Sequence, residues 1–180
     1  KVLIHESALD YVAPRSEGIN DEDTINFGKH SIKVIHTPGH CPEHISLILG
    51  NHIFVGDTIF VSGCGNTKFR GVTEDLYSTF ANTMRNLDDN LQIHCGHDYA
   101  ESNLKFALSL DPENENIKEK LSEVEKSGWI TSTIGEEKKY NPFMRFDDPN
   151  LIKNLKKQDS SIKEDGESIF VKLRELRNAW

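Results

Sequence analysis

Three short segments of the sequence carry side chains that can bind a metal ion, and each follows an apolar, strand-like run. They are TPGH, which ends at His40, VGDT, which contains Asp57, and CGHD, which contains His97. Imidazole nitrogens and carboxylate oxygens suit zinc, manganese or iron, and a carboxylate can bridge two ions because it has two oxygens. Each residue also has an ordinary alternative, since a histidine after glycine can cap a turn and Gly-Asp-Thr is common in turns. The three residues taken alone suggest a metal site without establishing one.

The first half of the chain has the pattern of short strands joined by tight loops. Its β-type runs are separated by Gly, Pro, Asn and Asp, and they cover residues 32–36, 44–49, 52–55 and 91–94. One helix is expected between them, at about 74–87. Since loops at strand ends are where functional side chains converge, the candidate metal ligands are expected to meet there.

The second half has the pattern of amphipathic helices. Apolar residues recur with a period near 3.6 around 104–108, 117–124 and 169–176. The polar stretch 160–168 is expected to form a loop. The predicted boundaries are Asp111-Pro112 between the first two helices, Gly128 at the end of the second, and a capping box of Thr133 and Glu136.

These patterns predict an α+β protein with a β-rich part over residues 1–98 and a helical part over residues 99–180. The chain has 180 residues, and 36% hydrophobic content is enough for a buried core. Its net charge of −8 disfavours nucleic acid as a partner, and no apolar run approaches the roughly 20 residues of a membrane-spanning helix. Three cysteines do not suggest a disulfide framework, so we expect a monomer in the reducing cytoplasm.

Five segments, taken in order, resemble one protein family. They are TPGH, VGDTIFVSGCG, CGHDYAESNLKFAL, EEKKYNPFMR and LRELRN. The first two are shared widely across the metallo-β-lactamase superfamily, whereas the last three are far more restrictive. Together they resemble the hydroxyacylglutathione hydrolases, also called glyoxalase II, along nearly the whole chain.

The resemblance implies a metallo-β-lactamase αββα sandwich followed by a helical domain that recognises glutathione. In such a protein His40 would bind one divalent metal, Asp57 would bridge two, and His97 would bind the second, with zinc the first candidate and iron or manganese the alternatives. A water between two cations has its pKa lowered from ~15.7 to near 7, so hydroxide can attack the thioester carbonyl of a substrate such as S-D-lactoylglutathione. The resemblance thus implies thioester hydrolysis in methylglyoxal detoxification.

One family motif, T-H-x-H-x-D-H, is not found in this sequence, which begins at KVLIHES. In the family that motif supplies most of the metal ligands, so three of the usual seven remain, and the sandwich is expected to be incomplete at its N-terminus. We therefore expect this polypeptide alone to be depleted of metal and impaired as an enzyme.

The resemblance places substrate contacts in the helical half. Tyr99 falls where a hydroxyl contacts glutathione, and Arg174 and Arg177, three residues apart, would bind substrate carboxylates on one helix face. The alternatives are a tyrosine that packs at a helix start and a solvated basic face. The segment GCGNTKFRG departs from the family by one residue, so Lys68 and Phe69 are candidates for substrate binding that stand in doubt, with Asn66 as an alternative for the basic position.

Other residues have structural interpretations. A zinc site built from the three cysteines is disfavoured because no two of them have the C-x₂₋₄-C spacing. We expect His44 to be structural and Arg145 to be a buried cation at the junction of the two parts. Packing roles are expected for Cys64, Cys95, Trp129, Tyr140, Phe143, Met144, Phe146 and Trp180.

Two rival functions remain open from the sequence. The first is a mono-iron persulfide dioxygenase, a relative in the same superfamily that lacks the helical extension. The second is a glutathione-binding fragment without catalysis. YNPFMR and LRELRN favour the hydrolase over the first rival.

Overall fold

The computed structural model describes residues 1–11, 16–68, 70–128 and 130–180 of the chain. The strands are β1 (Val2–His5), β2 (Ser16–Ile19), β3 (Thr24–Phe27), β4 (His30–His36), β5 (Ile45–Leu49), β6 (His52–Gly56), β7 (Ile59–Phe60), β8 (Gly63–Cys64), β9 (Gln92–Cys95) and β10 (Ser132–Thr133). The helices are α1 (Thr73–Asn82), α2 (Ala100–Leu110), α3 (Glu115–Ser127), α4 (Ile134–Tyr140), α5 (Pro149–Gln158) and α6 (Gly166–Ala179), with 3-10 turns η1 (Glu6–Tyr11), η2 (Met84–Asn86) and η3 (Pro142–Met144).

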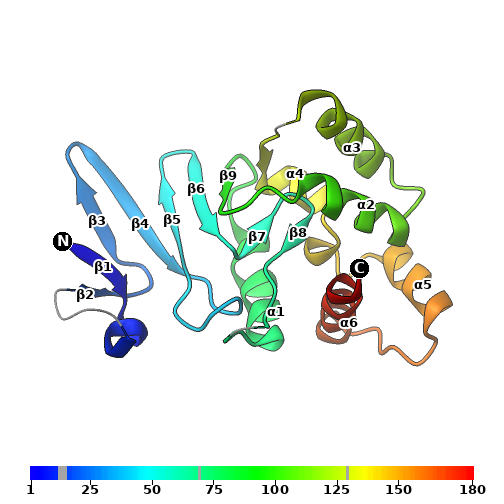
Figure 1. The fold of residues 1–180 in the computed structure, drawn as a ribbon, viewed down its shortest axis with the longest axis horizontal. Coiled ribbons are helices and arrows are strands. Elements are labelled where there is room, and N and C mark those ends of the chain that lie inside the picture. The colour runs from blue at the N-terminus through cyan, green and yellow to red at the C-terminus, as the bar shows by residue number, and fades with distance from the viewer. Residues whose placement is uncertain (12–15, 69, 129) are drawn as a thin grey trace.

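Strands β3 to β6 with β9 and β10 form one six-stranded sheet, and helices α2 to α6 gather beyond its β9 and β10 end (Figure 1). The strand order is β10-β9-β6-β5-β4-β3. Strands β3 to β6 pair antiparallel as a meander, whereas β6 pairs with β9 in parallel after a connection that contains α1. The four strands predicted from the sequence are confirmed. Strands β1, β2 and β3 were not predicted, and neither were β7, β8 and β10, which have two residues each and are too short to show a period.

The main apolar cluster covers one face of this sheet. Along β6 the side chains of Ile53 and Val55 are fully buried, whereas Phe54 on the other face is 44% exposed. This alternation follows from the two-residue period of a strand. The cluster includes Phe80 of α1 and Phe170 of α6, so it joins side chains from both halves of the chain.

The helices follow the sequence pattern except at two places. The helix expected at 74–87 ends at Asn82 and is followed by η2, and the loop expected at 160–168 is wrong for its last residues because α6 begins at Gly166. Helix α5 was not predicted, since Leu151 and Leu155 are its only fully buried residues. Among the described residues, no helix is long and apolar enough to cross a membrane.

The predicted helix ends are confirmed. The Thr133 hydroxyl accepts a hydrogen bond from the Glu136 N–H, and the Glu136 carboxylate accepts one from the Thr133 N–H. Gly128 ends α3 with a φ of 67°, a left-handed conformation that glycine adopts without strain.

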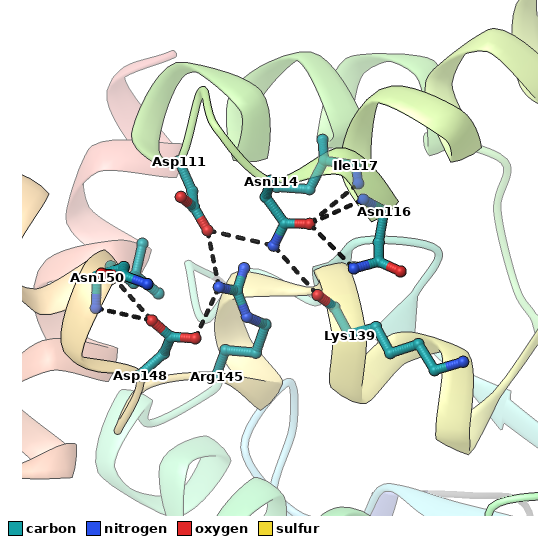
Figure 2. A network of polar contacts seen from close by, with 9 residues as sticks. Asp111, Asn114, Asn116, Ile117, Lys139, Arg145, Asp148 and Asn150 are labelled. Atoms are coloured by element: carbon teal, nitrogen blue, oxygen red, sulfur yellow. Dashed lines mark hydrogen bonds and ion pairs between the residues drawn. The ribbon is translucent and has the colours of Figure 1, made fainter.

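Arg145 is a buried structural cation that ties η3 to α2 and α5 (Figure 2). Its Nη2 atom donates to Asp111 Oδ2 at 2.7 Å and to Asp148 Oδ2 at 2.8 Å. Asp111 also accepts from Asn114 Nδ2 at 3.2 Å, and Asn114 caps the start of α3. Arg145 is thus a buried cation as expected, but Asp111 and Asp148 both belong to the helical part, so these ion pairs do not join it to the β-rich part.

The packing residues divide into two groups. Tyr140, Phe143, Met144 and Phe146 are buried as expected, and Phe143 and Phe146 contact the Phe170 ring. Trp180 was expected to pack in the same way, but it is 60% exposed and, among the described aromatic rings, meets only that of Phe106. Trp129 and Phe69 lie outside the described residues.

Candidate functional site

The three candidate metal ligands follow strands that run in the same direction. His40 lies four residues after β4, Asp57 directly follows β6, and His97 lies two residues after β9. Because β4 and β6 both pair antiparallel with β5, and β6 pairs in parallel with β9, the carboxyl ends of all three strands lie at one edge of the sheet. The sheet topology thus brings together residues that are far apart in the sequence.

Both imidazoles approach the same carboxylate oxygen. His40 Nε2 and His97 Nε2 each lie 3.5 Å from Asp57 Oδ2. The side chains of His40 and Asp57 are largely covered, at 22% and 26% exposure, whereas that of His97 is 55% exposed. The cluster is therefore held by the fold on one side and open to solvent on the other.

Hydrogen bonds to the backbone fix the orientation of this cluster. His40 Nδ1 donates to the Asn66 carbonyl at 2.7 Å, which holds the ring with its Nε2 atom toward Asp57. The Asp57 N–H donates to His44 Nε2 at 3.2 Å, and His44 Nδ1 lies 2.9 Å from Thr58 Oγ1. Burial lowers the pKa of His44 to about 4, so its ring is neutral and can accept the Asp57 N–H. His44 is structural, as expected.

Two glycines allow the backbone to approach Asp57 closely. A Cβ at Gly65 would lie 1.9 Å from the Asp57 carbonyl oxygen, and a Cβ at Gly96 would lie 2.7 Å from Asp57 Oδ1. A side chain at residue 65 would displace the Asp57 backbone, and one at residue 96 would displace its carboxylate. This lack of space explains why glycine stands at residue 65 in GCG and at residue 96 in CGH.

The three side chains are of the types that bind divalent cations, but they do not form a complete coordination shell. Two imidazole nitrogens and a carboxylate are ligands that zinc, iron and manganese accept, and the Asn66 carbonyl gives His40 the outer partner usual for a ligating histidine. Within the ranges that the structure describes, however, no group of three or more His, Cys, Asp or Glu side chains is arranged to hold an ion unaided. The three cysteines are free thiols.

A pocket of about 290 Å³ lies beside the cluster. Among the residues lining it are three cations and no acid, namely Phe60, Cys64, Asn66, Lys68, Tyr99, Asn103, Arg174, Arg177, Asn178 and Trp180. The Tyr99 ring stacks on His97 with 5.5 Å between centroids and is 48% exposed. Tyr99 and Asn66 therefore each contact the metal-ligand cluster and line the cationic pocket.

The two arginines of α6 differ in their surroundings. Arg174 is 5% exposed, and its Nη1 donates to the carbonyls of Cys64 at 3.0 Å and Gly65 at 3.2 Å. Arg177 is only partly buried and donates from Nε and Nη2 to Asn103 Oδ1 at 3.2 and 3.0 Å. Burial and the Arg174 charge lower the pKa of Arg177. The alternative of a solvated basic face is wrong for Arg174, and no carboxylate neutralises the pair within the pocket lining.

Sequence reasoning found some of this pocket and missed the rest. Lys68, Tyr99, Arg174 and Arg177 lie together around it, whereas Phe69 is outside the described residues. Asn66, weighed as an alternative to Lys68, contributes its carbonyl to His40 rather than a charge. Phe60 and Asn103 were missed, although both stand inside the quoted motifs, because neither residue type indicates a role on its own.

Glu137 is a fully buried carboxyl group in α4. Burial raises its pKa from an ordinary 4.5 to about 7, although hydrogen bonds from Ser132, Asn141, Ser62 and Tyr140 partly oppose the shift. Burial also raises the pKa of the neighbouring Tyr140 and, to about 12, that of Cys95, so both stay neutral near pH 7.

Because folded protein then holds the Glu137 proton more tightly than unfolded protein, the contribution of Glu137 to the free energy of unfolding should fall as pH rises from about 4.5 to 7. Glu137→Gln should remove this contribution, which amounts to about 3 kcal/mol, so that the difference in the free energy of unfolding between wild type and variant changes with pH. Urea unfolding at several pH values between 5 and 8 measures it, with the exposed Glu119→Gln as the control that keeps the wild-type slope. Equal slopes for wild type and Glu137→Gln would contradict the assignment.

Two family descriptions match the chain. Residues 4–97 match the metallo-β-lactamase superfamily, and residues 98–180 match the C-terminus of hydroxyacylglutathione hydrolase. A hydroxyacylglutathione hydrolase from Nitrosococcus oceani is 37% identical across all of this chain, which covers 72% of that protein. The cytoplasmic hydroxyacylglutathione hydrolase of Arabidopsis thaliana is 34% identical over 86% of this chain and 64% of its own length.

Solved structures share the fold at lower identity. ETHE1 from Myxococcus xanthus aligns with a TM-score of 0.59 at 23% identity, over 90% of this chain and 59% of that one. A metallo-β-lactamase from Staphylococcus aureus also gives 0.59, at 21% identity, over 98% of this chain and 50% of that one. The chain thus spans less than two thirds of either structure. At these identities the likeness concerns the fold, and the expected α+β fold with a C-terminal helical part is confirmed.

Proposed function

This chain belongs to the hydroxyacylglutathione hydrolase family of the metallo-β-lactamase superfamily, and on that premise we propose that it hydrolyses S-2-hydroxyacylglutathione thioesters to a 2-hydroxy acid and glutathione. The observation that carries the proposal is the position of the cationic pocket. It holds Lys68, Arg174 and Arg177 without an acidic lining residue, and it shares Tyr99 with the His40, Asp57 and His97 cluster. A substrate with carboxylates at one end and a thioester at the other fits such an arrangement.

The superfamily implies divalent metal binding, and we assign it to His40, Asp57 and His97. We propose two ions, zinc first and iron or manganese as alternatives, for which Asp57 would be the shared ligand. Bound divalent ions supply hydroxide at neutral pH and stabilise the charge that develops on the carbonyl oxygen. A catalytic zinc takes about three protein ligands and a water, so three donors are too few for two ions and these residues alone should hold them weakly.

The remaining residues bind and orient the substrate. Arg177 and Lys68 line the pocket, where their charges can pair with glutathione carboxylates, and the Tyr99 ring, which stacks on His97, can orient the substrate between the pocket and the metal ligands. Arg174, whose Nη1 is held by two carbonyls, contributes its charge from beneath the pocket. These roles place the positive charge at a distance from the scissile bond.

Changing Arg174 and Arg177 together to Ala should raise KM by about 100-fold, since the charge-assisted contact of Arg177 and the nearby positive charge of Arg174 are both lost, with little change in kcat. Arg177→Ala alone should raise KM without loss of stability, because Arg174 is the arginine that also holds the backbone of residues 64 and 65. Steady-state kinetics on the complete gene product measure both effects, with Lys172→Ala on the same helix as the control. Lost kcat at unchanged KM would count against the assignment.

The direct test is thiol release from S-D-lactoylglutathione by the complete gene product, before and after metal removal by EDTA. We expect release that stops with EDTA and returns with zinc. Oxygen consumption with a glutathione persulfide and no thioester turnover would indicate the dioxygenase instead. Glutathione binding without either reaction would indicate a non-catalytic binding protein.

We also propose a cytoplasmic monomer that binds neither membranes nor nucleic acid. The support is the three free cysteines, the net charge of −8 and the Arabidopsis relative named as cytoplasmic. Light scattering at micromolar concentration tests the oligomeric state, and a mass of twice the chain would contradict it.

A further inference from the structure

Glu137 and Asn141, one turn apart at the end of α4, hold a distant turn of the chain. Glu137 Oε2 accepts hydrogen bonds from the Ser62 N–H at 2.9 Å and from Asn141 Nδ2 at 2.7 Å, and Oε1 accepts from the Tyr140 hydroxyl at 2.9 Å. Asn141 Nδ2 also donates to the Gly63 carbonyl at 3.0 Å. Both side chains are fully buried, so no solvent can replace these partners.

The turn that they hold is one that would not persist unaided. Ser62 has a φ of 56°, a left-handed conformation that a non-glycine residue adopts only where its surroundings impose it. Its N–H group is buried and points at the Glu137 carboxylate. Glu137 thus satisfies the donor that this conformation directs into the protein interior.

The backbone of the same turn also contacts the metal-ligand cluster and the cationic pocket. The carbonyls of Cys64 and Gly65 accept from Arg174, and the Asn66 carbonyl accepts from His40 Nδ1. The Gly65 N–H donates to the Thr58 carbonyl, next to Asp57. A shift of residues 60–66 would therefore move the floor of the cationic pocket and the partner of a metal ligand together.

We propose that Glu137 and Asn141 are positioning residues that fix the turn of residues 60–66, and through it set the affinity of the cationic pocket and the orientation of His40. The identity of the ligand, glutathione, rests on the proposed function. The link between residues 137 and 141 and the turn does not depend on that function. It requires hydrogen-bond acceptors at residue 137 rather than a negative charge. Glutamine can meet that requirement, because its Oε1 can accept from Ser62 and Asn141 while its amide faces the Tyr140 hydroxyl. Leucine takes away the acceptor of the buried Ser62 N–H and one of the acceptors of Asn141 Nδ2.

Two measurements on the whole protein test the link. The first is the rate at which iodoacetamide alkylates Cys64, resolved by mass spectrometry under native conditions, with the half-buried Cys41 as an internal reference. Cys64 lies under Arg174 and burial raises its pKa to about 11, so its reaction in the wild type should be slow. The second is the Kd for glutathione, measured by calorimetry.

Glu137→Leu should speed Cys64 alkylation and weaken glutathione binding by about tenfold each, and Glu137→Gln should restore both to near the wild-type values. Asp111→Leu is the matched control, since it also replaces a buried carboxylate in the helical part but its hydrogen bonds are to Arg145 and Asn114. It should lower thermal stability while leaving both readouts within about twofold of wild type. If Glu137→Leu does not fold, Asn141→Ala replaces it with the same expected direction.

Wild-type values in Glu137→Leu, equal effects in Asp111→Leu, or failure of Glu137→Gln to restore the readouts would each overturn the proposal. If the wild type does not bind glutathione, the proposed function loses its substrate. Cys64 alkylation still decides whether residues 137 and 141 hold the turn, so the two failures are distinguishable.

Discussion

Asp57→Asn in the complete gene product is expected to lower kcat/KM for S-D-lactoylglutathione by about 1000-fold, equivalent to ~4 kcal/mol of lost transition-state stabilisation. Asp57 Oδ2 is the oxygen that both imidazoles approach at 3.5 Å, so it is the negative group about which the cluster is arranged. Asparagine keeps the shape and one oxygen but loses the charge that a cation requires. Thiol-release kinetics and zinc content by mass spectrometry measure the two losses together.

Asp147→Asn makes the same chemical change at a carboxylate that is 59% exposed and paired with Arg85, away from the cluster. It should keep wild-type activity and zinc content. Full activity of Asp57→Asn at equal zinc content would remove Asp57 from the site. If activity is lost while the zinc content is unchanged, Asp57 is required for the reaction but is not a metal ligand.

Arg145→Met is expected to lower the free energy of unfolding by about 3–5 kcal/mol, because it leaves the Asp111 carboxylate buried without its cation. Asp111 is 5% exposed, and Arg145 Nη2 lies 2.7 Å from it (Figure 2). The loss should appear as a lower midpoint in urea unfolding with an unchanged slope.

Adding Asp111→Asn to Arg145→Met should recover part of that loss, since a neutral amide in this position no longer needs a cation. Lys105→Met, which breaks an exposed pair with Glu101 one helical turn away, should cost less than about 1 kcal/mol. A cost for Arg145→Met no larger than that for Lys105→Met would show that the buried network contributes little to stability.

The elements of the fold that the sequence predicts are those with a clear period. The strands β4, β5, β6 and β9 alternate or form apolar runs between turn residues, and helices α2, α3 and α6 show repeated apolar positions. Helix α5 escapes prediction because its ten residues bury only Leu151 and Leu155. The break after Asn82 escapes as well, since the apolar pattern continues through Met84 into the 3-10 turn.

The residues of the candidate site also include some that can be predicted from the sequence and some that cannot. His40, Asp57 and His97 can be singled out from the sequence because each follows a strand-like run and has a ligating side chain. The burial of Arg174 cannot, because its partner Cys64 lies 110 residues away and is reached only through the packing of α6. The role of Glu137 is hidden for the same reason, since Ser62 is 75 residues away and a glutamate in a polar helix normally faces solvent.

Anomalous diffraction at the zinc edge, from crystals of the complete gene product grown with zinc, tests the central claim most directly. The account predicts density adjacent to Asp57 and within coordination distance of both His40 Nε2 and His97 Nε2. Anomalous density elsewhere, with none beside Asp57 and these two imidazoles turned apart, would contradict it.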